Sequence, residues 1–161
     1  MTTEIERIAD LMEETFDGKP YYGPSLVGAL EDVTADLAAR RPDSTAHNIW
    51  EIVLHLTAEL YYACDVINGT AEPWIEGETT WRAVMDTSED SWRQAIHSLK
   101  QANRALVRTV RALDDAVVTQ EAQPSRRPFY VMLHGTLDHG IYHAGQIMLL
   151  KKLCAAPRLD G

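Results

Sequence analysis

Apolar residues recur every three or four positions along most of the chain. This spacing covers residues 3–16, 49–67 and 129–153, and it is the period of a helix that buries one face. The clearest pattern precedes the last of these, where steps of four and three alternate through Trp92, Ile96, Leu99, Asn103, Leu106, Val110 and Leu113. No segment shows the alternation of a convincing strand. The sequence therefore predicts an all-α fold.

The first of the four main helices is predicted to be broken. Its apolar stripe ends at Asp17 and Gly18, and the segment that follows, KPYYGPS, interrupts regular structure. Pro24 can occupy the first turn of a new segment, which stops near residue 41 and carries the apolar residues Leu26, Val27, Leu30, Val33 and Leu37. We therefore predict an up-down four-helix bundle with a broken first helix, formed as one domain over residues 1–161.

The second main helix has a well-marked start and is followed by a long connection. Asn48 is a good N-cap residue, and Glu51 lies three positions later, as in a capping box. Residues 69–87 have no lasting period, although connections in compact domains are usually short. Long connections are often lids, and this one contains Trp74 and Trp81 as candidates for the wall of an apolar pocket.

Composition narrows the possible partners. The chain has 161 residues and a formal net charge of −9, which argues against a nucleic-acid backbone or an anionic membrane as the main partner. A small molecule is expected instead. The N-terminal segment, MTTEIERIAD, has neither a basic region nor an apolar run, so we expect a cytoplasmic protein. Cys64 and Cys154 do not form a CxxC pair and are expected to be reduced thiols.

Three of the six histidines fall within residues 134–147, HGTLDHGIYHAGQI. His139 and His143 are four positions apart, so on a helix they project from the same face and can chelate one ion. His134 falls on a different face. Because a stable site needs at least three protein ligands, the third must come from another helix, where His55 lies at the edge of the apolar stripe. The alternative is that each histidine simply packs beside the core through a hydrogen bond.

Three segments carry a resemblance to a known family: YYGPSLVGAL, HNIWEIVLHLTAE and HGTLDHGIYHAGQI. Together they resemble the DinB-like (DinB/YfiT-like) family of helical-bundle metalloenzymes over nearly the whole chain. The resemblance implies that His55, His139 and His143 bind a divalent metal, with zinc or nickel first and iron or manganese as alternatives. Characterised members are mainly S-transferases that activate a low-molecular-weight thiol, with a few hydrolases or isomerases. Relatives often pair, so a homodimer is expected.

Neighbouring polar residues are candidates for orienting the ligands or the substrate. A ligating imidazole usually gives its second N–H to an oxygen, and the nearby candidates are Glu51, Glu59, Asp138 and Tyr142. Gln146 lies three positions after His143 and stays near the metal face, which favours a role in orienting a bound water or substrate. Gln146 and Tyr142 are therefore the predicted catalytic residues. The other functional class left open is a metal-binding or metal-free bundle that acts as a regulatory, stress-related module.

Glycines recur at five-residue intervals on the last predicted helix. They are Gly135, Gly140 and Gly145, and each costs roughly 1 kcal/mol relative to alanine in a helix. We expect the close approach of another helix to compensate for this cost.

Overall fold

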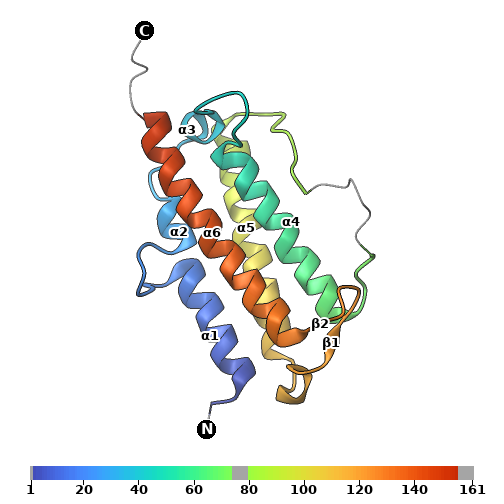
Figure 1. The fold of residues 1–161 in the computed structure, drawn as a ribbon. Coiled ribbons are helices and arrows are strands. Elements are labelled where there is room, and N and C mark those ends of the chain that lie inside the picture. The colour runs from blue at the N-terminus through green and yellow to red at the C-terminus, as the bar shows by residue number, and fades with distance from the viewer. Residues whose placement is uncertain (1, 74–79, 156–161) are drawn as a thin grey trace.

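The computed structural model describes residues 2–73 and 80–155, and helices make up most of it. Four long helices lie side by side (Figure 1): α1 (Glu4–Asp17), α4 (Ile49–Asn68), α5 (Glu89–Arg111) and α6 (Phe129–Ala155). They coincide with the four predicted main helices to within a few residues, so the all-α prediction is confirmed. The predicted up-down order is wrong, because α4 and α5 run in the same direction: Trp50 at the start of α4 packs against Trp92 at the start of α5, with 5.1 Å between the ring centroids. No helix in the described ranges is both long and apolar enough to cross a membrane.

The break after the first helix is more extensive than the apolar pattern predicted. Residues 24–41 form two short helices, α2 (Leu26–Ala29) and α3 (Ala35–Ala39). Each is capped by the residue before it, Ser25 or Thr34, whose side-chain oxygen accepts a backbone N–H. Between them Asp32 has a φ of 61°, and this left-handed conformation cannot continue a right-handed helix. The segment therefore turns instead of extending.

The connection between α5 and α6 contains short elements that the sequence did not reveal. A 3-10 helix, η1 (Asp115–Val117), is followed by two paired antiparallel strands, β1 (Glu121–Ala122) and β2 (Arg127–Pro128). Strands of two residues are too short to show alternation. The Asp115 carboxylate accepts the first two N–H groups of α1 at 3.0 and 2.9 Å, so this connection also fixes the start of the first helix.

The core lies between the four long helices, and the start of α4 is fixed within it. Its largest fully buried side chains are Ile5, Ile8, Ile49, Ile52, Leu99, Leu106, Leu133 and Ile147. The predicted capping box is present: Asn48 Oδ1 accepts the Glu51 N–H at 2.8 Å, and Glu51 Oε2 accepts the Asn48 N–H at 3.2 Å. Asn48 also donates to the carbonyl of Ala39 at 3.2 Å. These contacts hold α4 in register with α3.

The expectation about the glycines of α6 is wrong. A Cβ atom added at Gly135, Gly140 or Gly145 would meet no heavy atom within 4 Å among the described residues. No helix in the described ranges therefore approaches these positions closely, and the predicted compensation is not found there.

We predict that Gly145→Ala stabilises the protein by about 0.5–1 kcal/mol, because alanine loses less backbone entropy in a helix and meets open space here. Urea unfolding monitored by circular dichroism measures the change. Gly69→Ala is the matched control, since Gly69 ends α4 with a φ of 70° and a side chain there is strained. It should destabilise the chain. A loss of stability in Gly145→Ala would contradict the prediction.

Candidate metal centre

Three imidazole rings from two helices meet at one point. His55 comes from α4, and His139 and His143 come from α6. The Nε2 atom of His139 lies 3.1 Å from His55 Nε2 and 2.9 Å from His143 Nε2, and the ligand atoms of the three residues all lie within 4.8 Å of one another. The structure thus brings together the three predicted metal ligands.

The donor set fits a divalent cation. Two nitrogens bound to one zinc ion at about 2.0–2.1 Å each are no more than about 4 Å apart, and both measured separations from His139 Nε2 meet this condition. His55 and His143 are 7% and 3% exposed. Burial, with a smaller contribution from the charge of His139, lowers the pKa of both residues to about 4. Their rings are therefore neutral at neutral pH, the form that binds metals.

The outer nitrogen of His143, the ring nitrogen Nδ1 that faces away from the other histidines, is held by two linked side chains, Gln146 and Tyr142. This nitrogen lies 2.6 Å from Gln146 Oε1, and the Gln146 amide in turn donates to the Tyr142 hydroxyl at 2.9 Å. Because a carbonyl oxygen only accepts, this contact places the proton on Nδ1 and leaves the Nε2 lone pair facing the other histidines. Gln146 and Tyr142 thus contact the centre through His143. Their predicted catalytic role stays a prediction.

The outer nitrogen of His55 is held by a residue that sequence reasoning missed. Thr80, in the long connection before α5, places its hydroxyl oxygen 2.5 Å from His55 Nδ1. The next residue, Trp81, stacks on the His55 ring at 4.1 Å between centroids and on the His47 ring at 3.7 Å. In the sequence, the one indication of this contact was the position of Trp81 in a long connection. Trp74, the other aromatic of the predicted lid, lies outside the described residues.

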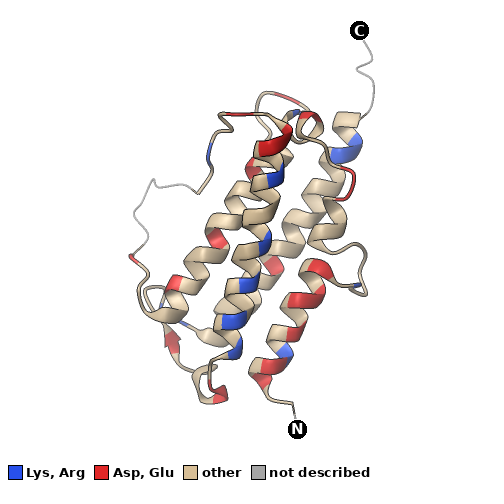
Figure 2. Cartoon of the chain, turned by 180° about the vertical axis from the view of Figure 1, so that it is seen from behind, with Lys and Arg blue, Asp and Glu red and all other residues tan. Residues whose placement is uncertain are grey.

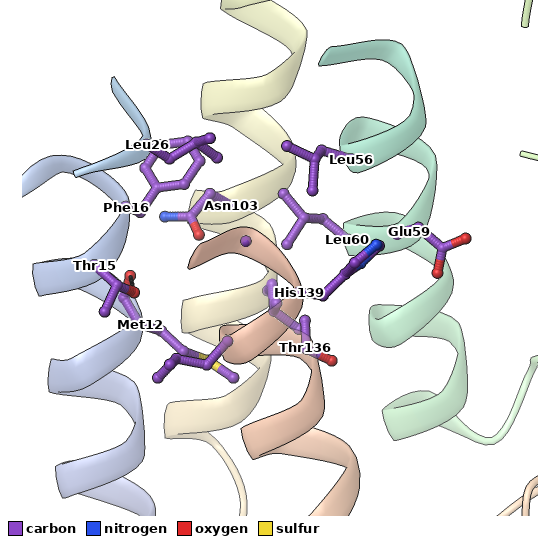
Figure 3. A pocket seen from close by; sticks show the side chains of 13 residues that line it. Met12, Thr15, Phe16, Leu26, Leu56, Glu59, Leu60, Asn103, Thr136 and His139 are labelled. Atoms are coloured by element: carbon purple, nitrogen blue, oxygen red, sulfur yellow. Dashed lines mark hydrogen bonds between the residues drawn. The ribbon is translucent and has the colours of Figure 1, made fainter. Parts of the chain in front are cut away.

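None of the predicted carboxylates contacts the three ligand rings through a hydrogen bond in the described parts of the chain. Glu51 instead caps α4 and pairs with Arg41 and His47. The carboxylate of Glu59 is directed away from His139 (Figure 3). Asp138 is exposed. The rings of His55 and His143 are therefore oriented by neutral oxygens, and the centre receives no negative charge from these residues.

The three histidines line an open pocket. It has a volume of about 630 Å³ and is bounded by residues before α4, by Trp81 and by the C-terminal half of α6, including Tyr142, Gln146, Leu149, Leu150 and Leu153. This volume falls in the usual range of about 300–1,000 Å³ for small-molecule sites. A small molecule can therefore reach the converging nitrogens.

The family comparison agrees with this geometry. A family model described as the DinB superfamily matches residues 24–147, a range that contains the three histidines together with Thr80, Trp81, Tyr142 and Gln146. Comparison with curated proteins and with solved structures gives no match.

We predict that the purified chain binds about one divalent ion and that His143→Ala abolishes this binding, because two imidazoles do not form a stable site. Elemental analysis measures the metal content, and calorimetric titration with Zn²⁺ measures the stoichiometry and affinity of binding. His134→Ala is the matched control, since His134 is on the same helix but its one hydrogen bond within the described residues goes to the Tyr130 carbonyl. Equal metal content in the two variants would rule out the centre.

We also predict that Thr80→Val lowers metal affinity by about 10–100-fold, the usual effect of removing the partner of a ligating histidine. Competition with a chelator measures the affinity. Thr87→Val, an exposed threonine at the far end of the same connection, should bind as the unmodified chain does. An unchanged affinity in Thr80→Val would show that Thr80 does not orient His55.

Proposed function

The chain belongs to the DinB superfamily, and from this premise we propose that it is a divalent-metal-dependent enzyme that activates a thiol or a water molecule. His55, His139 and His143 hold the ion, with zinc or nickel as the first candidates and iron or manganese after them. The observation that carries the proposal is the convergence of three Nε2 atoms on a pocket open to small molecules. An S-transferase-like reaction is the first choice and a hydrolase-like reaction the second.

An ion held by three neutral imidazoles keeps its full double charge and has positions left for a substrate, so a thiol or water bound there is deprotonated more easily. The chain supplies orientation and shielding. Gln146 and Thr80 hold the outer nitrogens of His143 and His55, and Trp81 covers one face of the His55 ring.

The pocket wall favours a substrate with an apolar part. Leu149, Leu150 and Leu153 line one side of it, and Leu149 and Leu153 are more than half exposed. An electrophile with an apolar body would bury this surface while its reactive atom approaches the histidines. A cytoplasmic location and the pairing of two chains belong to the same proposal.

The test is a thiol-transfer screen on the metal-loaded chain. With Co²⁺ as a visible probe, a small thiol such as cysteine or glutathione should shift the absorption bands, and transfer to an electrophile such as 1-chloro-2,4-dinitrobenzene should require the ion. We expect His143→Ala to lose at least about 100-fold in kcat/KM, because the nucleophile is then not activated. His134→Ala should retain the rate.

A different result would support a regulatory or metal-binding module. If the chain holds a stoichiometric ion, but neither thiols nor small anions change the Co²⁺ spectrum and no ester or thiol substrate turns over, the position facing the pocket is closed to ligands. The enzymatic proposal then has no basis, whereas the metal centre itself stands.

A further inference from the structure

A second hollow lies inside the protein, between α1, α4, α5 and α6 (Figure 3). Its volume is about 40 Å³, enough for about three water molecules at roughly 10–15 Å³ each or for a short alkyl group. Most of its wall is apolar and is formed by Met12, Phe16, Leu26, Leu56, Leu60 and Leu106. His139 and Gly140 border it on the side of α6.

Asn103 lines this cavity and has no hydrogen-bond partner among the described residues. Asn103 of α5 is 8% exposed, and Figure 3 shows its amide beside Phe16, on the side that faces α1. Its side chain forms no hydrogen bond to any residue in the described ranges, although nearly all buried amides are hydrogen-bonded. Asn103 occupies a position in the apolar stripe of α5 where leucine would fit the helical spacing equally well. Every fully buried side-chain nitrogen or oxygen among the described residues has a hydrogen-bond partner, so the amide of Asn103 is reachable from outside. A ligand that enters here can therefore accept a hydrogen bond from it.

The cavity adjoins a basic groove on the surface. Asn103 and Phe16 line both the cavity and a groove between α1 and α5. The groove carries four cations of α5, Lys100, Arg104, Arg108 and Arg111, which form a stripe on the back of the molecule (Figure 2). This stripe is unusual in a chain with a net charge of −9. Two acidic residues of α1, Glu13 and Asp17, also line the groove.

Three of these four cations form no ion pair with an acidic residue in the described ranges. Arg111 pairs with Asp10 and Glu13 at 2.8 Å, whereas Lys100 and Arg104 form no ion pair with any residue that the structure describes. The unpaired cations lie within one turn of Asn103 on the same helix. An anion in the groove would thus be close to the cavity entrance.

We infer that the cavity and the groove form one binding site for a small anionic amphiphile. The short alkyl end fills the cavity, the anionic head lies beside Lys100 and Arg104, and the Asn103 amide donates a hydrogen bond to the head group. This inference does not depend on the proposed enzymatic reaction, because it concerns a different opening of the protein and the head group contacts none of the three histidines, although His139 borders both hollows.

The test compares three probes with the same six-carbon tail: hexanoate, hexanol and hexylammonium. Binding to the full chain is measured by calorimetry and by chemical shifts of the Leu56 and Leu106 methyl groups. Hexanoate should bind at least about tenfold more tightly than hexanol, and hexylammonium most weakly, because the groove is positive. Hexyl phosphate tells a carboxylate head from a phosphate head, and saturable binding of either supports the site.

Two variants separate the contributions. The surface variant Lys100→Glu/Arg104→Glu should abolish the preference for hexanoate while leaving hexanol binding within about twofold. Asn103→Leu should weaken hexanoate by about tenfold, the usual effect of losing a hydrogen bond to a charged group, and urea unfolding shows whether this buried variant folds normally. Arg93→Glu is the control, because Arg93 is on the same helix but pairs with Asp90 away from the groove. It should leave all the affinities unchanged.

The length of the probe's alkyl chain provides an independent criterion. A closed cavity predicts that affinity rises from butanoate and then stops rising once the cavity is filled, whereas adsorption to an apolar surface gains roughly fourfold per added methylene without limit. The inference is overturned if hexanoate shows no saturable binding at millimolar concentration. It is also overturned if the three probes bind equally and neither variant changes them, since the cavity then holds only water.

Discussion

The relative register of α4 and α6 is the constraint on which the candidate centre depends. His55 reaches His139 across the interface of these helices with 3.1 Å between nitrogens, whereas one helical turn advances about 5.4 Å. A slip of one turn would therefore separate the donors completely. The register is held at the start of α4, where Asn48 caps the helix and bonds to Ala39 of α3, and by the fully buried Ile52 and Ile147 on the two helices.

Burying an imidazole costs free energy unless its second ring nitrogen forms a hydrogen bond. For two of the ligands the chain supplies this bond, from two different segments. Gln146 is local to His143, one turn further along α6. Thr80 is remote from His55 in sequence and reaches it from the segment just before α5. Trp81 is inserted between the rings of His47 and His55. The formation of the centre is thus coupled to the conformation of this connection as well as to helix packing.

The features that the sequence predicted are those with local causes. The four long helices follow from apolar spacing, the cap of α4 from Asn48 and Glu51, and the pairing of His139 with His143 from one turn of helix. The path of an irregular connection has no such period, so the contact of Thr80 with His55 could not be predicted. The turn at Asp32 depends on one backbone angle. Asn103 fitted the apolar seam by position, and only the structure shows that its amide faces a cavity.

His139 differs from the other two ligands because, within the described ranges, no hydrogen bond orients its ring. The same residue borders both the open pocket and the inner cavity. Its outer nitrogen has no hydrogen-bond partner among the described residues, so packing alone sets the angle of its ring. One side of the ring faces the open pocket with His55 and His143, and the residue also borders the inner cavity. An occupant of that cavity would remove the space into which the ring can turn and so keep Nε2 directed at the other two nitrogens. His139 is therefore the ligand through which an occupant of the interior would act on the geometry of the centre.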